Sequence, residues 1–360
     1  SGAPLTSADL QAVAANLRWS ALAGGLAIGA VAWANPAVPA IGADRAAFGL
    51  ADLAIVLAVA LRFGAIPFHR PVARLTNTAP GTAIPLVLVW SPAALAVVVT
   101  WATDGNTIAL LAPSGIGADL IIVGAAVSLI LGAIGAWLQD DLGHIVGYSI
   151  VQDAGFVLLG LAAGGADSGQ HARTWLLILV VAKTAFATWA TVIEARFRTA
   201  RLPELNGWAR RSPILGVALV GITVATIGLP GLLAWQTRTA LVEAATGGPL
   251  AIILQVGGLA SLAYYGRIIA AGLARPVTLS SAAQSDRPVR PEGGRADLGT
   301  ARRAWSVNRP PIAAGLVVVL VLLSLAVAVG GLGGPEAAGA TGPLASPVSP
   351  VSPVDVVPGA

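Results

Sequence analysis

Ionisable residues inside long apolar runs are the residues of this sequence that could do chemistry. The only lysine, Lys183, lies in the run TWLLILVVAKTAFATWATVI, and Asp153 lies in the preceding run, GHIVGYSIVQDAGFVLLGL. A short loop joins the two runs, so helices formed by them would be antiparallel and would place both residues near mid-membrane at nearly the same depth. The spacing therefore predicts an ammonium–carboxylate pair. Such a pair is either a proton relay between a buried lysine and a neighbouring carboxylate or a static ion pair that fixes helix packing.

Four further residues are candidates for a proton path. Arg62 lies in ADLAIVLAVALRFGAIPFH, and Arg238 follows a Pro-Gly break by about two turns. Because arginine stays protonated where a buried lysine can release its proton, these two are candidates for fixed or modulating charges. Glu243 and His144 are candidates for proton entry or exit, and His144 equally fits an interfacial loop position. A charge at a helix centre costs about 2.5–3.5 kcal/mol on insertion scales, which makes each such residue a functional candidate.

These residues require elements that cross a bilayer. The chain has a mean hydropathy of +0.80 and only 11% charged residues, against about 25% in soluble domains. Apolar runs long enough to span about 30 Å of hydrocarbon recur along it, and a spanning segment must satisfy its own backbone hydrogen bonds. The sequence therefore predicts an all-α, polytopic transmembrane helix bundle of about nine or ten spans with discontinuous helices. The expected spans are residues 7–34, 50–67, 82–102, 117–138, 143–164, 171–196, 212–229, 232–246, 248–273 and 311–332.

The same pattern divides the chain into four parts. Residues 1–275 are expected to form the transmembrane domain, 276–310 a polar, arginine-rich loop, 311–332 a final transmembrane helix, and 333–360 a disordered tail rich in Pro, Ala, Gly and Ser. The basic loops HRPVARL and RFRTARLPELNGWARR fall on one side by parity, which is assigned to the cytoplasm. The loop 276–310 joins them only if 232–246 is re-entrant; if that segment crosses fully, the loop lies on the other side. The segment is short and follows Leu229-Pro230-Gly231, so half of a broken helix is a further possibility.

Composition also limits the classes of function. The pI near 10.3 arises from arginines in loops, which indicates a membrane surface and not nucleic acid. The chain has no cysteine, no phosphate-binding or dinucleotide-binding glycine motif, and its three histidines, at positions 69, 144 and 171, are too scattered for a metal site. No catalytic residue, metal or cofactor is therefore expected, and redox chemistry would belong to partners.

The absence of an initiator methionine and of a signal peptide indicates a processed or incomplete chain.

Four motifs occur in one order along the chain: LRFGAIPFHRPVARLTNTAPGTAIP, LQDDLGHIVGYSIVQDAGFVLLGL, ELNGWARRSPILGVALVGITVATIGLPGLLAWQTRTAL and LAYYGR. They resemble, in turn, a lysine-containing helix end with Pro-Phe-His and Ala-Pro, a Tyr-Ser-Ser-Ile helix, a broken helix with Gly-Ile-Pro-Pro, and a Tyr-Tyr-Tyr-x-Arg helix. Over about residues 7–275, the chain thus resembles the proton-conducting, antiporter-like membrane subunits of respiratory complex I and of Mrp-type cation/proton antiporters. The resemblance is nearest to the N-type subunit of bacterial NADH:quinone oxidoreductase.

The resemblance implies a fold of about fourteen helices in two inverted halves, with discontinuous helices at the ion path. By this comparison the chain lacks the family's opening helices. Arg62 stands where the family has its central lysine, and Arg238 stands where it has the lysine of the second broken helix. Lys183 matches a lysine of the larger antiporter-like subunits.

Other positions depart from the family pattern. The expected glutamate falls on Ala14, a further lysine falls on Pro92, and a membrane histidine is replaced by Asp153. A Lys-Arg pair before Tyr-Ser reads Gly143-His144. These departures favour, as an alternative, a scaffold subunit that does not conduct protons.

The resemblance implies a membrane subunit of a complex I-type oxidoreductase that carries protons through buried charges and water. It places the chain, as a multi-pass protein, in the inner membrane of a bacterium. The expected partners are other membrane subunits and the lipid bilayer; contact with quinone is left open, and no nucleic acid is expected. Besides the scaffold, the alternatives are an Mrp-type antiporter subunit and an unrelated secondary transporter of similar composition.

Overall fold

Helices make up every regular element of the described residues. The computed structural model describes residues 7–33, 45–79, 81–104, 116–163, 165–275 and 310–329. The helices are α1 (Ser7–Trp33), α2 (Arg45–Phe63), α3 (Arg70–Thr78), α4 (Ser91–Asp104), α5 (Ile116–Leu138), α6 (Leu142–Ala163), α7 (Gly165–Phe197), α8 (Trp208–Arg211), α9 (Pro213–Ile227), α10 (Leu233–Ala245), α11 (Gly248–Leu259), α12 (Ser261–Leu273) and α14 (Pro310–Ala328). A π-helical turn, Leu86–Trp90, leads into α4, and a 3-10 turn, Leu202–Leu205, precedes α8.

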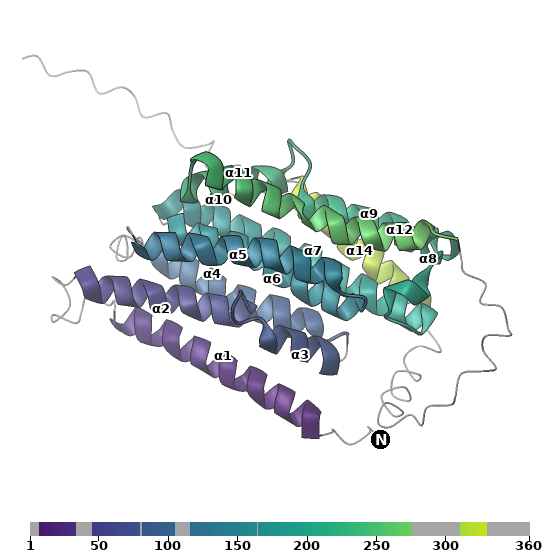
Figure 1. Cartoon of the computed structure of the whole chain (residues 1–360), viewed down its shortest axis with the longest axis horizontal. Coiled ribbons are helices and arrows are strands. Elements are labelled where there is room, and N and C mark those ends of the chain that lie inside the picture. The colour runs from purple at the N-terminus through teal and green to yellow at the C-terminus, as the bar shows by residue number, and fades with distance from the viewer. Residues whose placement is uncertain are drawn as a thin grey trace, which may run out of the picture.

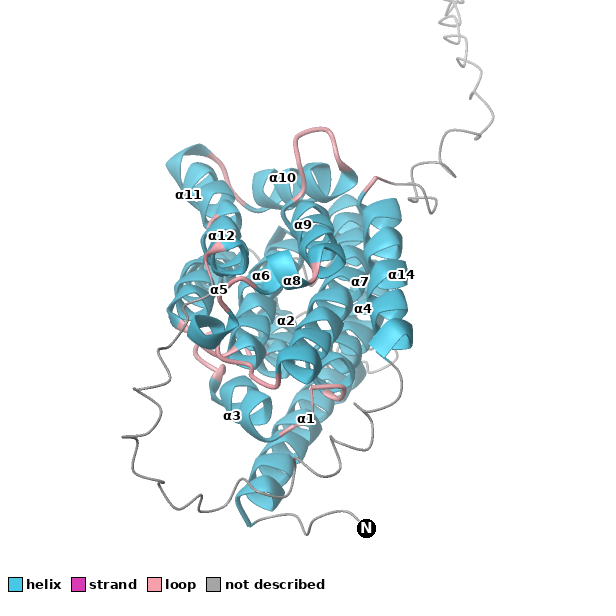
Figure 2. Cartoon of the chain, turned by 90° about the vertical axis from the view of Figure 1, so that its right-hand side faces the viewer, coloured by secondary structure: helices cyan, strands magenta, loops and turns pink. Residues whose placement is uncertain are grey.

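The long helices run roughly along one common axis, so the bundle has two ends (Figure 1), and Figure 2 shows it along that axis. In the described part of the chain, four helical segments are long and apolar enough to cross a membrane. They are Ala118–Leu138, Leu142–Ala163, Asp167–Phe197 and Gly248–Leu273. The predicted all-α membrane bundle is confirmed. Among the described residues, shorter apolar helices lie at Leu53–Phe63, Leu86–Thr100, Pro213–Ile227 and Gly315–Val327.

The segment 232–246 is neither a separate full crossing nor a re-entrant loop but the second half of a broken helix, the further possibility that its short length and the preceding Leu229-Pro230-Gly231 indicate. Helices α9 and α10 have 15 and 13 residues, or about 22 and 20 Å, so neither alone spans about 30 Å. Near one end of the bundle the carbonyl of Leu215 in α9 accepts a hydrogen bond from Trp189, whereas Leu241 in α10 lies against Gly160, toward the other end. The two helices therefore make one crossing that is interrupted at residues 228–232.

Helices α11 and α12 make the return crossing. At the end of α12, the carbonyl of Ala271 accepts a hydrogen bond from the Gly207 amide at 2.9 Å, and the carbonyl of Ile268 accepts one from Trp208 Nε1 at 3.2 Å. Helix α12 thus ends beside the basic loop that precedes α8. The chain enters the predicted loop 276–310 from this arginine-rich end; residues 276–309 and the predicted tail 333–360 lie outside the described residues.

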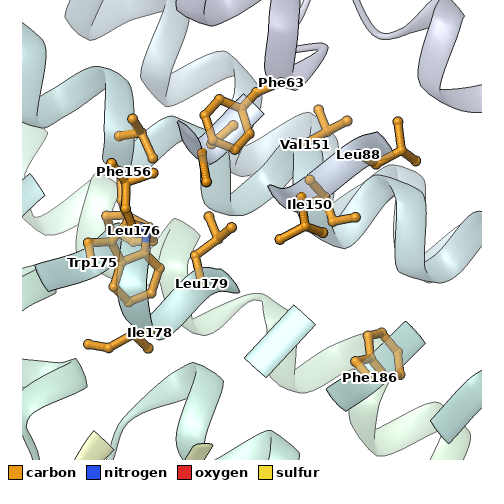
Figure 3. Packing of buried hydrophobic residues seen from close by; sticks show 14 of the residues in the cluster. Phe63, Leu88, Ile150, Val151, Phe156, Trp175, Leu176, Ile178, Leu179 and Phe186 are labelled. Atoms are coloured by element: carbon orange, nitrogen blue, oxygen red, sulfur yellow. The ribbon is translucent and has the colours of Figure 1, made fainter. Parts of the chain in front are cut away.

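Helix α6 is the centre of the bundle, because almost all its residues are buried. Apolar side chains from the neighbouring helices pack around it, among them Phe63 from α2 and Trp175 from α7 (Figure 3). Glycines allow α5 to approach closely: a Cβ at Gly132 would lie 2.7 Å from backbone atoms of Gln152 in α6. Helices α6 and α7 pack against each other through Phe156 and Trp175, whose ring centroids are 5.0 Å apart, and these two helices carry the predicted ion pair.

Arg267 in α12 links this helix to the end of α5, at the arginine-rich end of the bundle. Its Nη1 donates to the carbonyls of Trp137 (2.6 Å) and Gln139 (2.7 Å), and its Nη2 pairs with Asp140. These carbonyls at the end of α5 have no partner within their own helix, and a cation there also interacts favourably with the helix dipole.

Changing Arg267 to Gln is expected to lower the free energy of unfolding by about 1–2 kcal/mol, because partly exposed, charge-assisted hydrogen bonds are lost. Denaturation of the purified chain in detergent would measure the effect. The matched control is Arg210→Gln, which alters an exposed arginine at the same end. Equal stability of the two variants would contradict the assigned role of Arg267.

Candidate functional site

Lys183 and Asp153 form an ion pair in the middle of the bundle. Lys183 Nζ lies 2.8 Å from Asp153 Oδ2, and the two side chains are 0% and 4% exposed. The antiparallel helices α6 and α7 bring them to the same depth, as the spacing predicts, so the predicted pairing is confirmed. The backbone carbonyl of Asp153 also accepts a hydrogen bond from Trp175 Nε1 at 3.2 Å. The pair is therefore held on both helices and is closed to bulk solvent.

Two adjacent tyrosines of α12 form one wall of the site. Tyr264 and Tyr265 are fully buried with ring centroids 4.6 Å apart, and Lys183 Nζ lies 6.0 Å from the Tyr265 ring centroid. The Tyr265 hydroxyl lies 3.5 Å from Thr226 Oγ1 in the last turn of α9. Neither tyrosine was among the predicted site residues. The available signal was a Tyr-Tyr pair inside an apolar run, because buried tyrosines need partners for their hydroxyls.

Arg238 brings a second cation to this site. It is 2% exposed, and its Nη1 donates to the carbonyl of Ile227, the last residue of the half-helix α9. Its guanidinium carbon lies 4.7 Å from the ring centroid of Phe156, one turn after Asp153 on α6. Asp153 interacts electrostatically with Arg238. The break between α9 and α10 therefore places a fixed positive charge beside the ion pair.

Arg62 lies farther out, in the last turn of α2. Its guanidinium donates to the Ser91 hydroxyl, and the side chain is half-buried. Next to Ser91, Trp90 Nε1 donates to Thr184 Oγ1 at 2.9 Å, adjacent to Lys183 in sequence. Contacts at the start of α4 thus lie between Arg62 and Thr184, the neighbour of Lys183. It also borders a small cavity lined by Asn16, Trp19, Ser20, Leu61, Gly64, Pro71, Val72, Leu75 and Leu88.

His144 and Glu243 are not brought to the pair. His144 lies nine residues before Asp153 on α6, about 13 Å along the helix axis. Its Nδ1 is 3.7 Å from Asp141 Oδ1 in the loop before the helix. Glu243 is exposed near the end of α10, whereas Arg238 on the same helix is buried. The entry and exit roles of both residues stay predictions. The described residues contain no group of three potential ligands that could hold a metal ion.

The sequence that forms this helix bundle matches a known protein family. Residues 27–262 match the family described as NADH:quinone oxidoreductase/Mrp antiporter, TM. The chain belongs to this family. The match includes α2 to α11 and the beginning of α12, and thus the helices that carry Lys183, Asp153 and Arg238.

Individual members of this family are similar over part of their length. NADH-quinone oxidoreductase subunit N of Paraburkholderia phymatum is 27% identical over 227 residues, which cover 60% of this chain and 46% of that protein. Subunit N of Cereibacter sphaeroides is 29% identical over 245 residues, with 67% and 52% covered. The chain therefore spans about half the length of these curated relatives.

Solved structures show the same fold at lower identity. A chain of respiratory complex I from Thermus thermophilus with bound NADH matches with a TM-score of 0.66 at 20% identity, over 89% of this chain and 66% of that one. A chain of the Mrp complex from Dietzia sp. matches with a TM-score of 0.64 at 19% identity, over 91% and 66%. The predicted resemblance to antiporter-like subunits is confirmed.

Proposed function

We propose that this chain is a membrane subunit of a complex I-type NADH:quinone oxidoreductase, or of a related Mrp-type assembly, in a bacterial inner membrane. In this proposal it takes part in proton translocation through the pair of Lys183 and Asp153. The observation that carries the proposal is the ion pair itself, closed to bulk solvent in mid-bundle beside a broken helix. NADH oxidation and quinone reduction would belong to partner subunits.

The chemistry of the pair suits a relay. A lysine ammonium exchanges its proton more readily than a guanidinium does, and a discontinuous helix exposes polar backbone groups at the ion path of many transporters. Here the carbonyl of Ile227 is such a group, and Arg238 binds it. Titratable and fixed charges thus meet where one helix is interrupted, which supports proton transfer at this depth.

A scaffold subunit without proton conduction is the second candidate. Arg62 and Arg238 support it, because these permanent charges occupy two positions where the family resemblance expects lysines. Proton uptake by vesicles that contain the assembled complex would decide between the two functions. With Lys183→Ala, strongly reduced uptake per assembled complex supports conduction, and unchanged uptake per assembled complex supports the scaffold.

The break between α9 and α10 supports membership of a larger assembly. Its residues Leu229, Pro230 and Gly231 are exposed, and Leu229 is 55% exposed, although the break lies in mid-crossing. Lipid-exposed irregular backbone does not occur within the hydrocarbon region, because its polar groups would have no partners. We therefore expect a neighbouring membrane subunit to cover this break.

Changing Leu229 to Cys is expected to give a cross-link from the break to another membrane subunit. The chain has no cysteine, so the new thiol would be its only one. A short photoactivatable cross-linker on this thiol, followed by mass spectrometry of the native membranes, would identify the neighbour. Leu262→Cys, at another exposed position, is the matched control. Cross-linking of the Leu229→Cys variant to lipid alone would contradict the expected coverage.

A further inference from the structure

We propose that Arg238 is a reserve partner for the Asp153 carboxylate, which it takes over when Lys183 gives up its proton. Arg238 is then a positioning residue: it acts on the relay through Asp153 and does not carry the moving proton. This inference rests on the proposed role of the pair of Lys183 and Asp153 in proton transfer.

Counting charges shows why the relay needs a second cation. With Lys183 protonated, Lys183 and Arg238 give the buried site two positive charges against the one negative charge of Asp153. When Lys183 becomes neutral, Asp153 is left as a buried carboxylate without its partner, which is strongly unfavourable. Arg238 stays charged in both states, so its guanidinium then balances the carboxylate and the excess positive charge of the first state is removed. The neutral state of Lys183 is then compatible with the buried site.

The geometry of Arg238 fits this role. Only Nη1 is engaged, with the Ile227 carbonyl, and the buried Nε and Nη2 atoms have no hydrogen-bond partner among the described residues. The guanidinium lies over Phe156, one turn from Asp153, and Asp153 already interacts with it electrostatically. Two donors of this cation are thus free to bind a carboxylate. Such unpaired buried donors require an explanation, because most buried polar atoms are satisfied.

Gly258 in α11 is part of the same arrangement. A Cβ at this position would collide with Nη2 of Arg238 and would lie 2.7 Å from the Phe156 ring. The absence of a side chain there leaves the space that the guanidinium occupies. Arg238 of α10 is therefore held between Phe156 of α6 and Gly258 of α11.

The proton step balances with water as the only other reactant. Lys183 Nζ gives one proton to a water molecule, so –NH₃⁺ becomes –NH₂ and the water becomes hydronium, and no other bond changes. Asp153 remains a carboxylate throughout and moves its contact from Nζ to the Arg238 guanidinium. A hydronium ion on the opposite side then gives one proton to Nζ and becomes water, so –NH₂ becomes –NH₃⁺ and the carboxylate returns to Lys183.

A stability cycle in the whole chain, reconstituted in lipid nanodiscs, tests this proposal without using transport. Lys183→Met mimics the neutral lysine, and Arg238→Gln removes the reserve partner. Arg238→Gln is expected to lower the thermal midpoint only slightly in the wild-type background, since Lys183 still pairs with Asp153. In the Lys183→Met background its shift is expected to be about twofold larger or more, because contacting residues are not additive when they share a partner.

Two further variants keep the test decisive if the double variant does not fold. Adding Asp153→Asn removes the carboxylate and is expected to restore folding and additivity. Restoring a cation with Arg238→Lys in the Lys183→Met background is expected to recover most of the midpoint. Additive shifts, or a triple variant no more stable than the double one, would overturn the role of Arg238. By contrast, unchanged proton uptake in Lys183→Ala would overturn the proposed function and leave this cycle readable.

Discussion

Changing Lys183 to Arg is expected to leave the subunit assembled but to lower proton uptake about tenfold or more, because a guanidinium keeps the ion pair and does not readily release its proton. The variant separates the two roles that the buried pair could have. A static ion pair tolerates arginine, since the charge next to Asp153 is preserved. Proton uptake by vesicles that contain the complex, divided by the rate of electron transfer, is the measurement.

Lys183→Ala is the companion variant. It removes the charge that pairs with Asp153 and leaves Arg238 as the remaining buried cation for this carboxylate, so the cost is expected to stay below the about 3–5 kcal/mol of a broken buried pair. We therefore expect both reduced uptake and less assembled complex, and the amount of subunit in the membrane serves as the control. Normal uptake in Lys183→Arg would remove Lys183 from the proton path.

Changing Gly132 to Val is expected to lower the free energy of unfolding by about 3 kcal/mol, because overpacking a close helix contact forces backbone shifts. A Cβ at this position would lie 2.7 Å from the backbone of Gln152, in the helix that carries Asp153. Since a backbone cannot move aside as a flexible side chain can, α5 and α6 must separate. Denaturation of the purified chain in detergent, followed by circular dichroism, is the measurement.

Gly124→Val is the matched control on the same helix, α5. No atom lies within 4 Å of a Cβ built at Gly124. Its stability should stay near wild type, since valine also removes the flexibility of glycine from the unfolded chain. Equal loss in the two variants would mean that the effect comes from the valine and not from the contact between α5 and α6.

The confirmed part of the prediction concerns features that are local in sequence. The length of the apolar runs determined that the chain forms membrane helices. The short loop between two of those runs determined that Asp153 and Lys183 meet, because antiparallel helices joined by a short loop have matched depths. The bundle and the pair could thus be predicted without any long-range information.

Other features depended on contacts between residues far apart in the chain. Periodicity could not tell whether 232–246 crosses the membrane alone, since the answer depends on α10 continuing the course of α9 past residues 228–232. The burial of Tyr264 and Tyr265 against Lys183 depends in the same way on the return of α12 to α7 and α9.

Arg238 shows most clearly which features the sequence determines and which depend on the tertiary structure. The sequence by itself determined that a permanent charge follows a helix break inside an apolar run, which identified the residue as a candidate. Only the tertiary structure decided what that charge meets: the carbonyl of Ile227 at the end of one half-helix, the ring of Phe156, and the field of Asp153. The physical reason is that spacing along a helix determines depth and face, whereas the partner of a buried charge is determined by which helices pack against that face.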